Sequence, residues 1–184
     1  EQLGPLTLCQ IAACLSRRPE TELIYTDHDM IDSSNNHHSP QFSPGWSPDY
    51  FLQNDYIGGV FFIKQSPWLS NYLQQYNFST SSNWRYDLLL RFTETPRVID
   101  HSPKIMWSCL NRAVDQQANM KLVEKSLERR CENATVGPSP IPGHARINWH
   151  ADSSTKVSII IPTTGNLELL KPCIESIQQK TDYE

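Results

Sequence analysis

The chain has 184 residues, of which 38% are hydrophobic and 20% are charged, and its formal net charge is -4. This composition is that of a folded globular protein rather than of a disordered chain, and with no run of Lys or Arg it gives no electrostatic support for a nucleic-acid or anionic-membrane partner. No apolar run approaches the ~20 residues that a membrane-spanning helix needs, so no transmembrane segment is expected.

The first elements of the chain alternate between helix and strand. Residues 6–18 carry apolar side chains at helical spacing and are followed by Pro19, which predicts a helix that ends there. Residues 23–26 form a short apolar and β-branched run, which predicts a strand leading directly into residues 27–29 (DHD). Helix, short loop and strand in this order are typical of an α/β fold.

The middle of the chain mixes loops with further strands and helices. Residues 32–48 are polar and Pro-rich and predict an irregular loop, after which Pro48 opens a short helix to residue 52. Residues 56–64 predict a buried strand that contains two glycines. The remaining predicted elements are helices over 66–76, 86–93 and 112–130, and one or two strands within 98–105.

The last part of the chain predicts a linker and then a new β–loop–α unit. Residues 131–143 hold three Pro and two Gly, which is the composition of a linker. Residues 157–161 (VSIII) predict a strand that Pro162 ends, and residues 167–180 predict a helix with Asn166 as its N-cap.

The tripeptide at residues 27–29 is the sharpest chemical signal in the sequence. Asp27 and Asp29 follow the predicted strand, where alternate side chains project the same way, so both carboxylates are expected to converge on one hard cation. Mg²⁺ takes oxygen ligands and typically uses one or two carboxylates together with substrate phosphates. A solvated acidic loop is the alternative. A calcium-binding loop fits poorly, because Asp32 stands where a glycine is required and the acidic residues are too few for a closed oxygen cage.

Further polar and aromatic residues are candidates for a substrate site. Asp87, near the start of a predicted helix, is either a base for an attacking hydroxyl or a carboxylate that the helix dipole stabilises. The neighbours His37 and His38 are metal-ligand candidates or simply exposed, and His101 reads as a structural histidine. A cluster of aromatic residues and glycines predicts either a sugar-stacking surface or ordinary core packing; its members are Trp46, Tyr50, Tyr56, Gly58 and Gly59.

The cysteines indicate a reducing environment. Five Cys occur without C-x-x-C spacing and in an odd number, which is typical of free thiols in a cytosolic protein. A cytoplasmic location, or one at the inner face of the membrane, is therefore the expectation.

The ordered set of motifs resembles the family-two glycosyltransferases, especially bacterial proteins with tandem catalytic domains that build surface polysaccharides. The resemblance covers residues 1–112 and 155–184 and rests on several segments in order. These are the strand and DxD motif at 23–29, the loop at 40–49, the segment at 54–59 (NDYIGG), the helix at 86–91 (YDLLLR), the strand at 99–104 (IDHSPK), and a second opening strand and helix at 157–177.

The resemblance implies a GT-A fold, a Rossmann-like α/β fold for nucleotide-diphospho-sugar transferases that is incomplete in this chain. Residues 1–112 would be the metal and acceptor half of one glycosyltransferase domain, 113–154 a helix plus Pro-rich linker, and 155–184 the first β–α unit of a second domain. It also implies an inverting hexosyltransferase that moves a sugar from a nucleotide-sugar donor to a glycan or lipid-linked glycan acceptor. A fragment of this kind is expected to be inactive alone.

The resemblance also implies roles for single residues. Asp27 and Asp29 would hold Mn²⁺ or Mg²⁺, and Asp87 would be the catalytic base. The acceptor would be bound by Trp46, Asn54, Tyr56, Gly58 and Gly59, and a nucleotide in the second domain by Pro162 and Thr163.

Two positions depart from the family pattern. Arg85 stands where members often carry an acidic residue, so that Asp87 or Glu94 would have to serve as base; Ser108 stands in place of a metal-binding histidine. Both departures favour a second hypothesis, in which the domain is degenerate and non-catalytic and binds glycan or acts as a scaffold. Intact Asp27 and Asp29 favour the enzyme.

Overall fold

A computed structural model describes residues 1–75, 83–110, 116–150 and 156–181. The chain divides into two compact units, Glu1–Asn148 and Trp149–Glu184. The predicted start of the helix at residues 112–115 lies outside the described residues.

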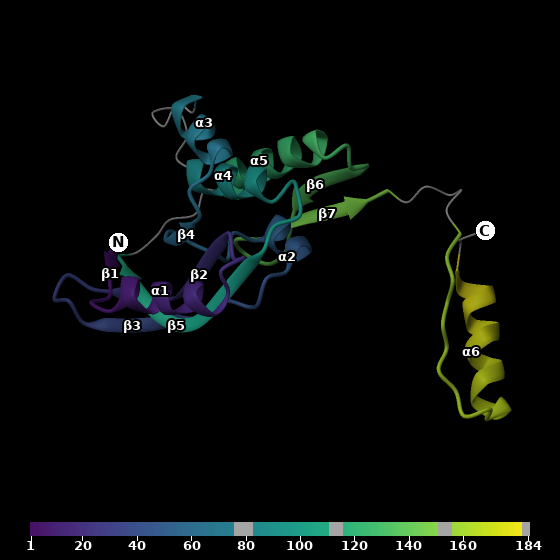
Figure 1. Ribbon diagram of the computed structural model, residues 1–184. Helices are drawn as coiled ribbons and strands as arrows, with labels where there is room; N and C mark the ends of the chain where they lie inside the picture. The colour runs from purple at the N-terminus through teal and green to yellow at the C-terminus, as the bar shows by residue number, and fades with distance from the viewer. Residues whose placement is uncertain (76–82, 111–115, 151–155, 182–184) are drawn as a thin grey trace. The chain divides into compact units, whose positions relative to one another are not determined.

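A mixed sheet organises the first unit, and β2 (Leu23–Ile31) runs through its centre (Figure 1). The strand order is β1–β5–β2–β3, and β4 also pairs with β2. The other strands are β1 (Gln2–Leu3), β3 (His37–Gln41), β4 (Phe61–Ile63) and β5 (Ile99–Cys109). Strands β2 and β5 are parallel and the other pairs are antiparallel. The expectation of an α/β fold is confirmed, and the mixed sheet is consistent with a Rossmann-like arrangement.

Strand β2 changes partner halfway along its length. Its first residues pair with β4, from Leu23 opposite Ile63 to Tyr25 opposite Phe61. Its last residues pair with β3, with a register shift between His28 and Met30. The ladder to β5 also shifts on both sides of Asp27. Such irregularities bend a strand and re-aim its side chains, and they are common next to functional sites.

The main core lies between one face of the sheet and three helices. These are α2 (Pro48–Gln53), α4 (Trp84–Phe92) and α5 (Gln116–Arg129). The core residues are at most 4% exposed and include Leu23, Tyr25, Phe51, Tyr86, Leu89, Leu90, Val123 and Leu127. Full burial of one such apolar side chain contributes roughly 1.5–3 kcal/mol, so this layer fixes α4 against β2. Helix α3 (Pro67–Gln75) adds Leu69 to the buried residues.

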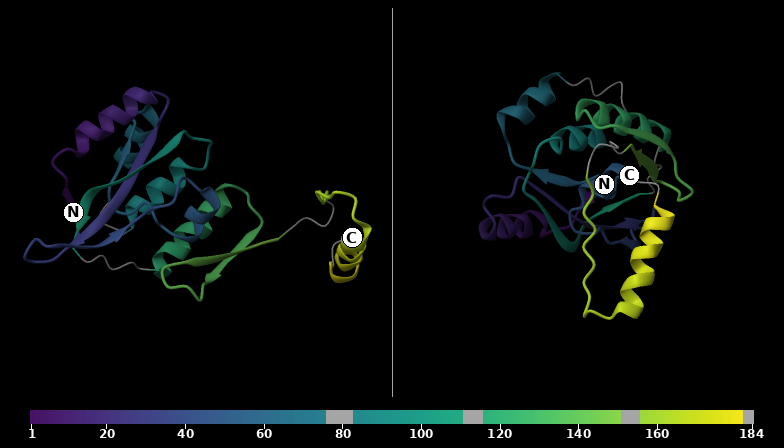
Figure 2. Two further views of the ribbon diagram at one scale, coloured as in Figure 1. Left: turned by 90° about the horizontal axis from the view of Figure 1, so that it is seen from below. Right: turned by 90° about the vertical axis from the view of Figure 1, so that its right-hand side faces the viewer.

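Helix α1 (Thr7–Arg17) covers the other face of the sheet. Ile24 lies between Leu23 and Tyr25 in the strand and therefore points to the opposite side. It packs with Ile11 of α1 and with Met106 of β5 in a second, smaller cluster. Thr7 Oγ1 donates to the carbonyl of Met106 at 2.5 Å, which ties the start of the helix to the sheet. Figure 2 shows α1 apart from α4 and α5.

The segment that reads as a linker contains regular structure. Strands β6 (Ala134–Pro138) and β7 (Ala145–Trp149) form a two-stranded sheet of their own. Helix α5 contacts both α4 and β6, and Arg130 Nη2 donates to the carbonyl of Leu90 at 3.2 Å. Residues 116–148 therefore belong to the first compact unit, which ends at Asn148. The assignment of residues 1–112 and 155–184 to parts of two glycosyltransferase domains stays a prediction.

The second unit consists of an extended segment and helix α6 (Leu167–Lys180). The prediction for the helix is confirmed, and Asn166 caps it by accepting a hydrogen bond from the amide of Glu168 at 3.0 Å. The predicted strand at 157–161 is wrong: the segment has no ladder partner among the described residues, and Ile160 is 89% exposed. A strand forms only where another strand satisfies its backbone groups.

Three other element predictions need correction. Strand β2 extends to Ile31 and includes Asp27 and Asp29, which the sequence placed after the strand. The predicted loop at 32–48 contains β3, and the predicted strand at 56–64 shrinks to Phe61–Ile63. Gly58 has φ +83°, a left-handed conformation that breaks an extended run.

Across the parts of the chain that the structure describes, every helix is too short or too polar to cross a bilayer.

Candidate functional site

Two carboxylates sit inside the central strand of the sheet. Asp27 is 3% exposed and Asp29 is 7% exposed, on the half of β2 that leaves β4 and joins β3. Burying an ionised carboxylate is costly unless it is paired and hydrogen-bonded. Each of the two has such partners, and they come from different neighbouring segments.

Asp27 is held by β5 and by the loop after β3. His101 Nε2 lies 2.8 Å from Asp27 Oδ1, and the backbone amide of Ser43 donates to the same oxygen at 2.9 Å. The His101 ring stacks on Tyr25, with ring centroids 4.9 Å apart. This stack sits in the core, where burial raises the pKa of Tyr25. His101 is thus confirmed as a partnered histidine, and its partner is one of the two predicted metal ligands.

Asp29 is held by β3 and β5. His37 Nδ1 lies 2.8 Å from Asp29 Oδ2, and the Ser108 hydroxyl makes a short hydrogen bond to Asp29 Oδ1. Burial acts to raise the pKa of Asp29, but the hydrogen bonds from Ser108 and His37 outweigh it and hold that pKa below its usual value. The site therefore favours the ionised carboxylate.

The donor set fits a hard divalent cation in part. Among the residues that the structure describes, no three side chains of His, Cys, Asp or Glu gather into a ready-made metal cluster. Mg²⁺ needs only one or two carboxylates when phosphates and waters complete its shell. Asp27 Oδ2 accepts no hydrogen bond from the described residues, and each oxygen of Asp29 has one partner and a second lone pair. Two carboxylates with open acceptor positions suit that mode of binding, while the convergence of Asp27 and Asp29 on one ion stays a prediction.

A cavity of about 420 Å³ lies beside this half of β2. Three of the predicted acceptor residues line it, namely Asn54, Tyr56 and Gly58. Its other lining residues are His28, Met30, Gln41, Phe42, Ser43, Pro44, Tyr50, Asp55 and Cys109. Aromatic rings, an amide and a carboxylate around one hollow are the groups that bind a polar ring-shaped ligand by stacking and hydrogen bonding.

Two predicted acceptor residues lie elsewhere. Trp46 packs on Phe51, with ring centroids 5.4 Å apart, and lines a separate cavity of about 330 Å³. Gly59 lies against the side chains of Glu1 and Arg85, where an added Cβ would collide with the Glu1 carboxylate. The structure therefore brings together three of the five residues.

His144, in the connection between β6 and β7, contacts two residues that line the cavity without lining it itself. Its Nε2 lies 3.2 Å from both Tyr50 Oη and Asn54 Nδ2, and the ring of Tyr50 stacks on Tyr56 with centroids 5.3 Å apart. No local pattern points to His144, because it stands in a Pro-rich stretch 90 residues from Asn54 in the chain. His37 carried a weak signal as one of two adjacent histidines.

Asp87 lies in the first turn of α4 and is bound by other side chains. Arg91 Nε and Tyr72 Oη each donate to Asp87 Oδ2 at 3.1 Å. The carboxylate is 3% exposed, and the residues that line the 420 Å³ cavity do not include it. Arg85, two residues earlier, forms an ion pair with Glu1 at 2.7 Å. The role of Asp87 as base stays a prediction.

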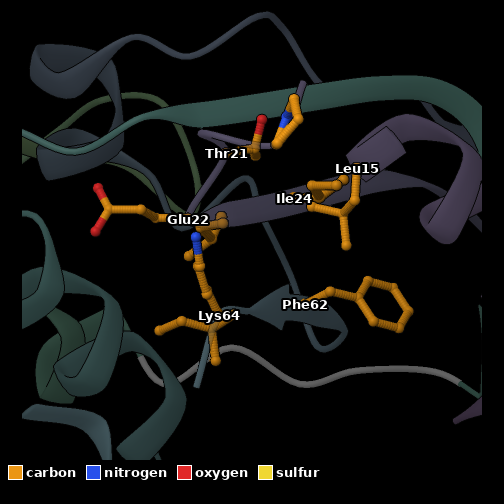
Figure 3. A pocket seen from close by; sticks show the side chains of 9 residues that line it. Leu15, Thr21, Glu22, Ile24, Phe62 and Lys64 are labelled. Carbon is orange, nitrogen blue, oxygen red and sulfur yellow. The ribbon is translucent and has the colours of Figure 1, made fainter. Parts of the chain in front are cut away.

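Two further cavities lie away from the carboxylates of β2, one in each compact unit. Pro162 and Thr163 line a cavity of about 560 Å³ with Asn166 and the first turns of α6. In the first unit an apolar cavity of about 330 Å³ lies at the start of β2, where Leu15, Ile24 and Phe62 surround it (Figure 3). That cavity is at the other end of β2 from Asp29.

Comparison with known proteins finds two relatives that match almost the whole chain. The O-antigen biosynthesis protein RfbC of Myxococcus xanthus is 26% identical over 194 aligned positions, which cover 100% of this chain and 15% of that protein. The uncharacterized protein y4gI of Sinorhizobium fredii is 29% identical over 197 positions, which cover 98% of this chain and 21% of that protein. The chain thus spans about a fifth or less of the length of these relatives. No protein-family model matches it.

Proposed function

We propose that the chain is part of a sugar-nucleotide-dependent glycosyltransferase that acts in polysaccharide synthesis. Three findings support this: the mixed α/β sheet, the order of motifs along the sequence, and the similarity over the whole chain to an O-antigen biosynthesis protein. The GT-A fold and membership of family two belong to the same proposal.

The observation that carries the proposal is the pair Asp27 and Asp29. A strand in the middle of a sheet gains stability from apolar side chains, and this strand instead buries two carboxylates that need four separate partners. Such an arrangement is costly for folding and is expected where function requires it. In the proposed enzyme, Asp27 and Asp29 hold Mn²⁺ or Mg²⁺. Such an ion stabilises the charge that develops on a leaving nucleoside diphosphate.

The proposed acceptor site is the cavity at the second half of β2, which includes Ser43, the residue whose amide binds Asp27, but neither of the two carboxylates. The stacked rings of Tyr50 and Tyr56 offer an aromatic wall, and Asn54 is held at its edge by Tyr50 and His144. A glycan or lipid-linked glycan placed there would present a hydroxyl to the donor sugar. In an inverting transfer the base removes the proton of that hydroxyl. The hydroxyl oxygen then bonds to the anomeric carbon of the donor sugar as the nucleoside diphosphate leaves. Asp87 is the proposed base, and Pro162 and Thr163 are proposed nucleotide contacts in the second unit.

A second candidate, a non-catalytic glycan-binding or scaffold domain, is favoured by the surroundings of Asp87. The Oδ2 oxygen of Asp87 already accepts hydrogen bonds from Arg91 and Tyr72, which is the arrangement of a structural carboxylate. Arg85 is likewise engaged with Glu1. Under this candidate the cavity with Tyr50 and Asn54 binds sugar, and no transfer takes place in this domain.

The two candidates are separated by Mn²⁺-dependent hydrolysis of a panel of nucleotide sugars by the full-length protein that contains this chain. The comparison variant is the double substitution Asp27→Ala/Asp29→Ala. The enzyme proposal expects hydrolysis that disappears in the double variant. If hydrolysis is unchanged in the double variant, catalysis takes place in another domain, and the binding role remains for this domain.

A further inference from the structure

A tight turn between β6 and β7 holds His144. The backbone amide of His144 donates to the carbonyl of Ile141 at 3.2 Å, which closes a four-residue turn. Pro142 and Gly143 are the two central residues, and Gly143 has φ +77°. Proline followed by a residue with positive φ is the pattern of a type II turn, which favours glycine in that position. The local sequence therefore holds His144 at a defined point of this connection.

The same turn fixes which ring nitrogen of His144 carries the hydrogen. His144 Nδ1 lies 3.0 Å from the carbonyl oxygen of Pro142. A carbonyl oxygen can only accept a hydrogen bond, so Nδ1 is the donor. In a neutral imidazole the other nitrogen then has a lone pair and no hydrogen. His144 Nε2 is therefore a hydrogen-bond acceptor.

This acceptor faces two side chains at the C-terminal end of α2. Tyr50 and Asn54 are four residues apart, so they lie on the same side of the helix end. His144 Nε2 is 3.2 Å from both Tyr50 Oη and Asn54 Nδ2. Asn54 Nδ2 also donates to Tyr50 Oη at 3.2 Å. The amide nitrogen of Asn54 is thus directed at both neighbours.

The orientation of the Asn54 amide follows from these contacts. The nitrogen and oxygen of an asparagine side chain are assigned from the hydrogen bonds around them. An acceptor on His144 requires the nitrogen there, which leaves Asn54 Oδ1 on the other side of the amide. Asn54 lines the cavity of about 420 Å³, and its Oδ1 accepts no hydrogen bond from the described residues. That oxygen is the part of Asn54 that remains for a ligand.

We propose that His144 is a positioning residue of this cavity, which turns Asn54 so that its Oδ1 accepts a hydrogen bond from a hydroxyl of a sugar ligand. The inference rests on the proposed role of the cavity as acceptor site. A sugar hydroxyl can donate such a bond, and the stacked rings of Tyr50 and Tyr56 offer an apolar surface to the same sugar. His144 acts through Asn54, because it does not line the cavity itself.

The tautomer can be tested without a ligand. Solid-state NMR of the full-length protein with isotope-labelled histidine, at about pH 8 where imidazoles are neutral, distinguishes a ring nitrogen that carries hydrogen from one that does not. The signals of His144 are those missing from His144→Gln. We expect hydrogen on Nδ1 and none on Nε2. Hydrogen on Nε2 overturns the inference, because Asn54 would then turn its oxygen toward His144 and its nitrogen toward the ligand.

The positioning role is tested by sugar binding to the full-length protein. The probes are the methyl glycosides of glucose, galactose, mannose and rhamnose, and calorimetry gives the dissociation constant of the one that the wild type binds most tightly. We expect His144→Ala to weaken binding about 5-fold, the size of one lost hydrogen bond. His144→Gln should restore most of it, because its side-chain carbonyl can accept in place of Nε2. The control is His150→Ala, since His150 is exposed just beyond β7.

Asn54→Ala shows whether the loss acts through Asn54. A positioning role predicts that His144→Ala weakens binding no further when Asn54→Ala is already present, because the two changes remove one interaction. Losses that multiply, or a loss in Asn54→Ala with wild-type binding in His144→Ala, overturn this inference alone. Wild-type binding in Asn54→Ala, or a wild type that binds none of the glycosides, contradicts the proposed acceptor site as well.

Discussion

The end of β2 and the first turn of α4 each bury a carboxylate, and they do so in different ways. Asp29 is held by a serine hydroxyl and a largely exposed imidazole that come from other strands. Asp87 is held by Arg91 of its own helix, four residues on, and by Tyr72. The partners of Asp29 are a hydroxyl and an imidazole, whereas Asp87 forms an ion pair with the guanidinium of Arg91.

The two carboxylates therefore differ in how readily their protein partners could be replaced by a ligand. A hydrogen-bond partner can turn away when a metal ion binds, whereas loss of one member of an ion pair leaves the other charge without its partner. The end of β2 is therefore the stronger candidate for ligand binding. The first turn of α4 needs direct evidence that its carboxylate takes part in chemistry.

The largest expected effect is at β2. Asp29→Asn in the full-length protein is expected to lower Mn²⁺-dependent turnover on the order of 10³-fold, because it removes a fixed charge at the reacting centre. Initial rates with saturating donor measure this. Glu128→Gln is the control, since Glu128 is an exposed carboxylate on α5; equal turnover in both variants would contradict the assignment.

The second-largest effect is expected in the core that packs α4 against β2. Leu89 of α4 is fully buried in the cluster that packs α4 against β2. Leu89→Ala is expected to lower the free energy of unfolding by about 3 kcal/mol, through lost burial and the cavity it leaves. Urea titration followed by tryptophan fluorescence measures the change. Leu73 on α3 is 42% exposed, so Leu73→Ala should change stability by less than ~0.5 kcal/mol.

A smaller effect is expected at α4. If Asp87 is the base, Asp87→Asn lowers kcat by about 10²-fold and leaves donor binding intact, which is the usual contribution of general base catalysis. Single-turnover kinetics and donor titration measure the two separately. Lost donor binding with normal chemistry would assign Asp87 a structural role, and the thermal unfolding temperature would then fall along with it.

The smallest effect is at an exposed carboxylate in the turn between β2 and β3. Hydrogen bonds from the side chain and backbone of Asn36 lower the pKa of Asp32 below its usual value. A carboxyl with a lowered folded-state pKa adds stability above its unfolded-state pKa and loses it as the pH falls through the folded-state value. Asn36→Ala should raise the pKa of Asp32, as an NMR titration of its carboxyl carbon will show; an unmoved midpoint would contradict the hydrogen-bond cause.

Local patterns predicted the helices better than the strands. Helix α6 and its Asn166 cap, and helix α2 with Pro48 at its start, follow from short-range rules and are confirmed. The strand predictions were wrong where the formation of a strand depends on a partner strand. Residues 157–161 have strand composition but no described partner, and β3 formed from polar residues because β2 offered it a free edge.

The sequence alone could predict only those site residues that belong to one local motif. Asp27 and Asp29 stand two apart on one strand, so the sequence shows them together. Their partners His101 and His37 lie 74 and 8 residues away, and His144 lies 90 residues from Asn54. Contacts of this kind depend on the strand order and on the register shifts around Asp27, which no local pattern contains.

The central claim is that Asp27 and Asp29 hold the cation that neutralises a nucleoside diphosphate. Crystals of the full-length protein with Mn²⁺ and a nucleoside diphosphate, measured by anomalous diffraction at the manganese edge, test it most directly. We expect a manganese peak within bonding distance of both carboxylates and of the diphosphate. A bound diphosphate with manganese elsewhere, and with Asp27 and Asp29 bound only to their four protein partners, would contradict it.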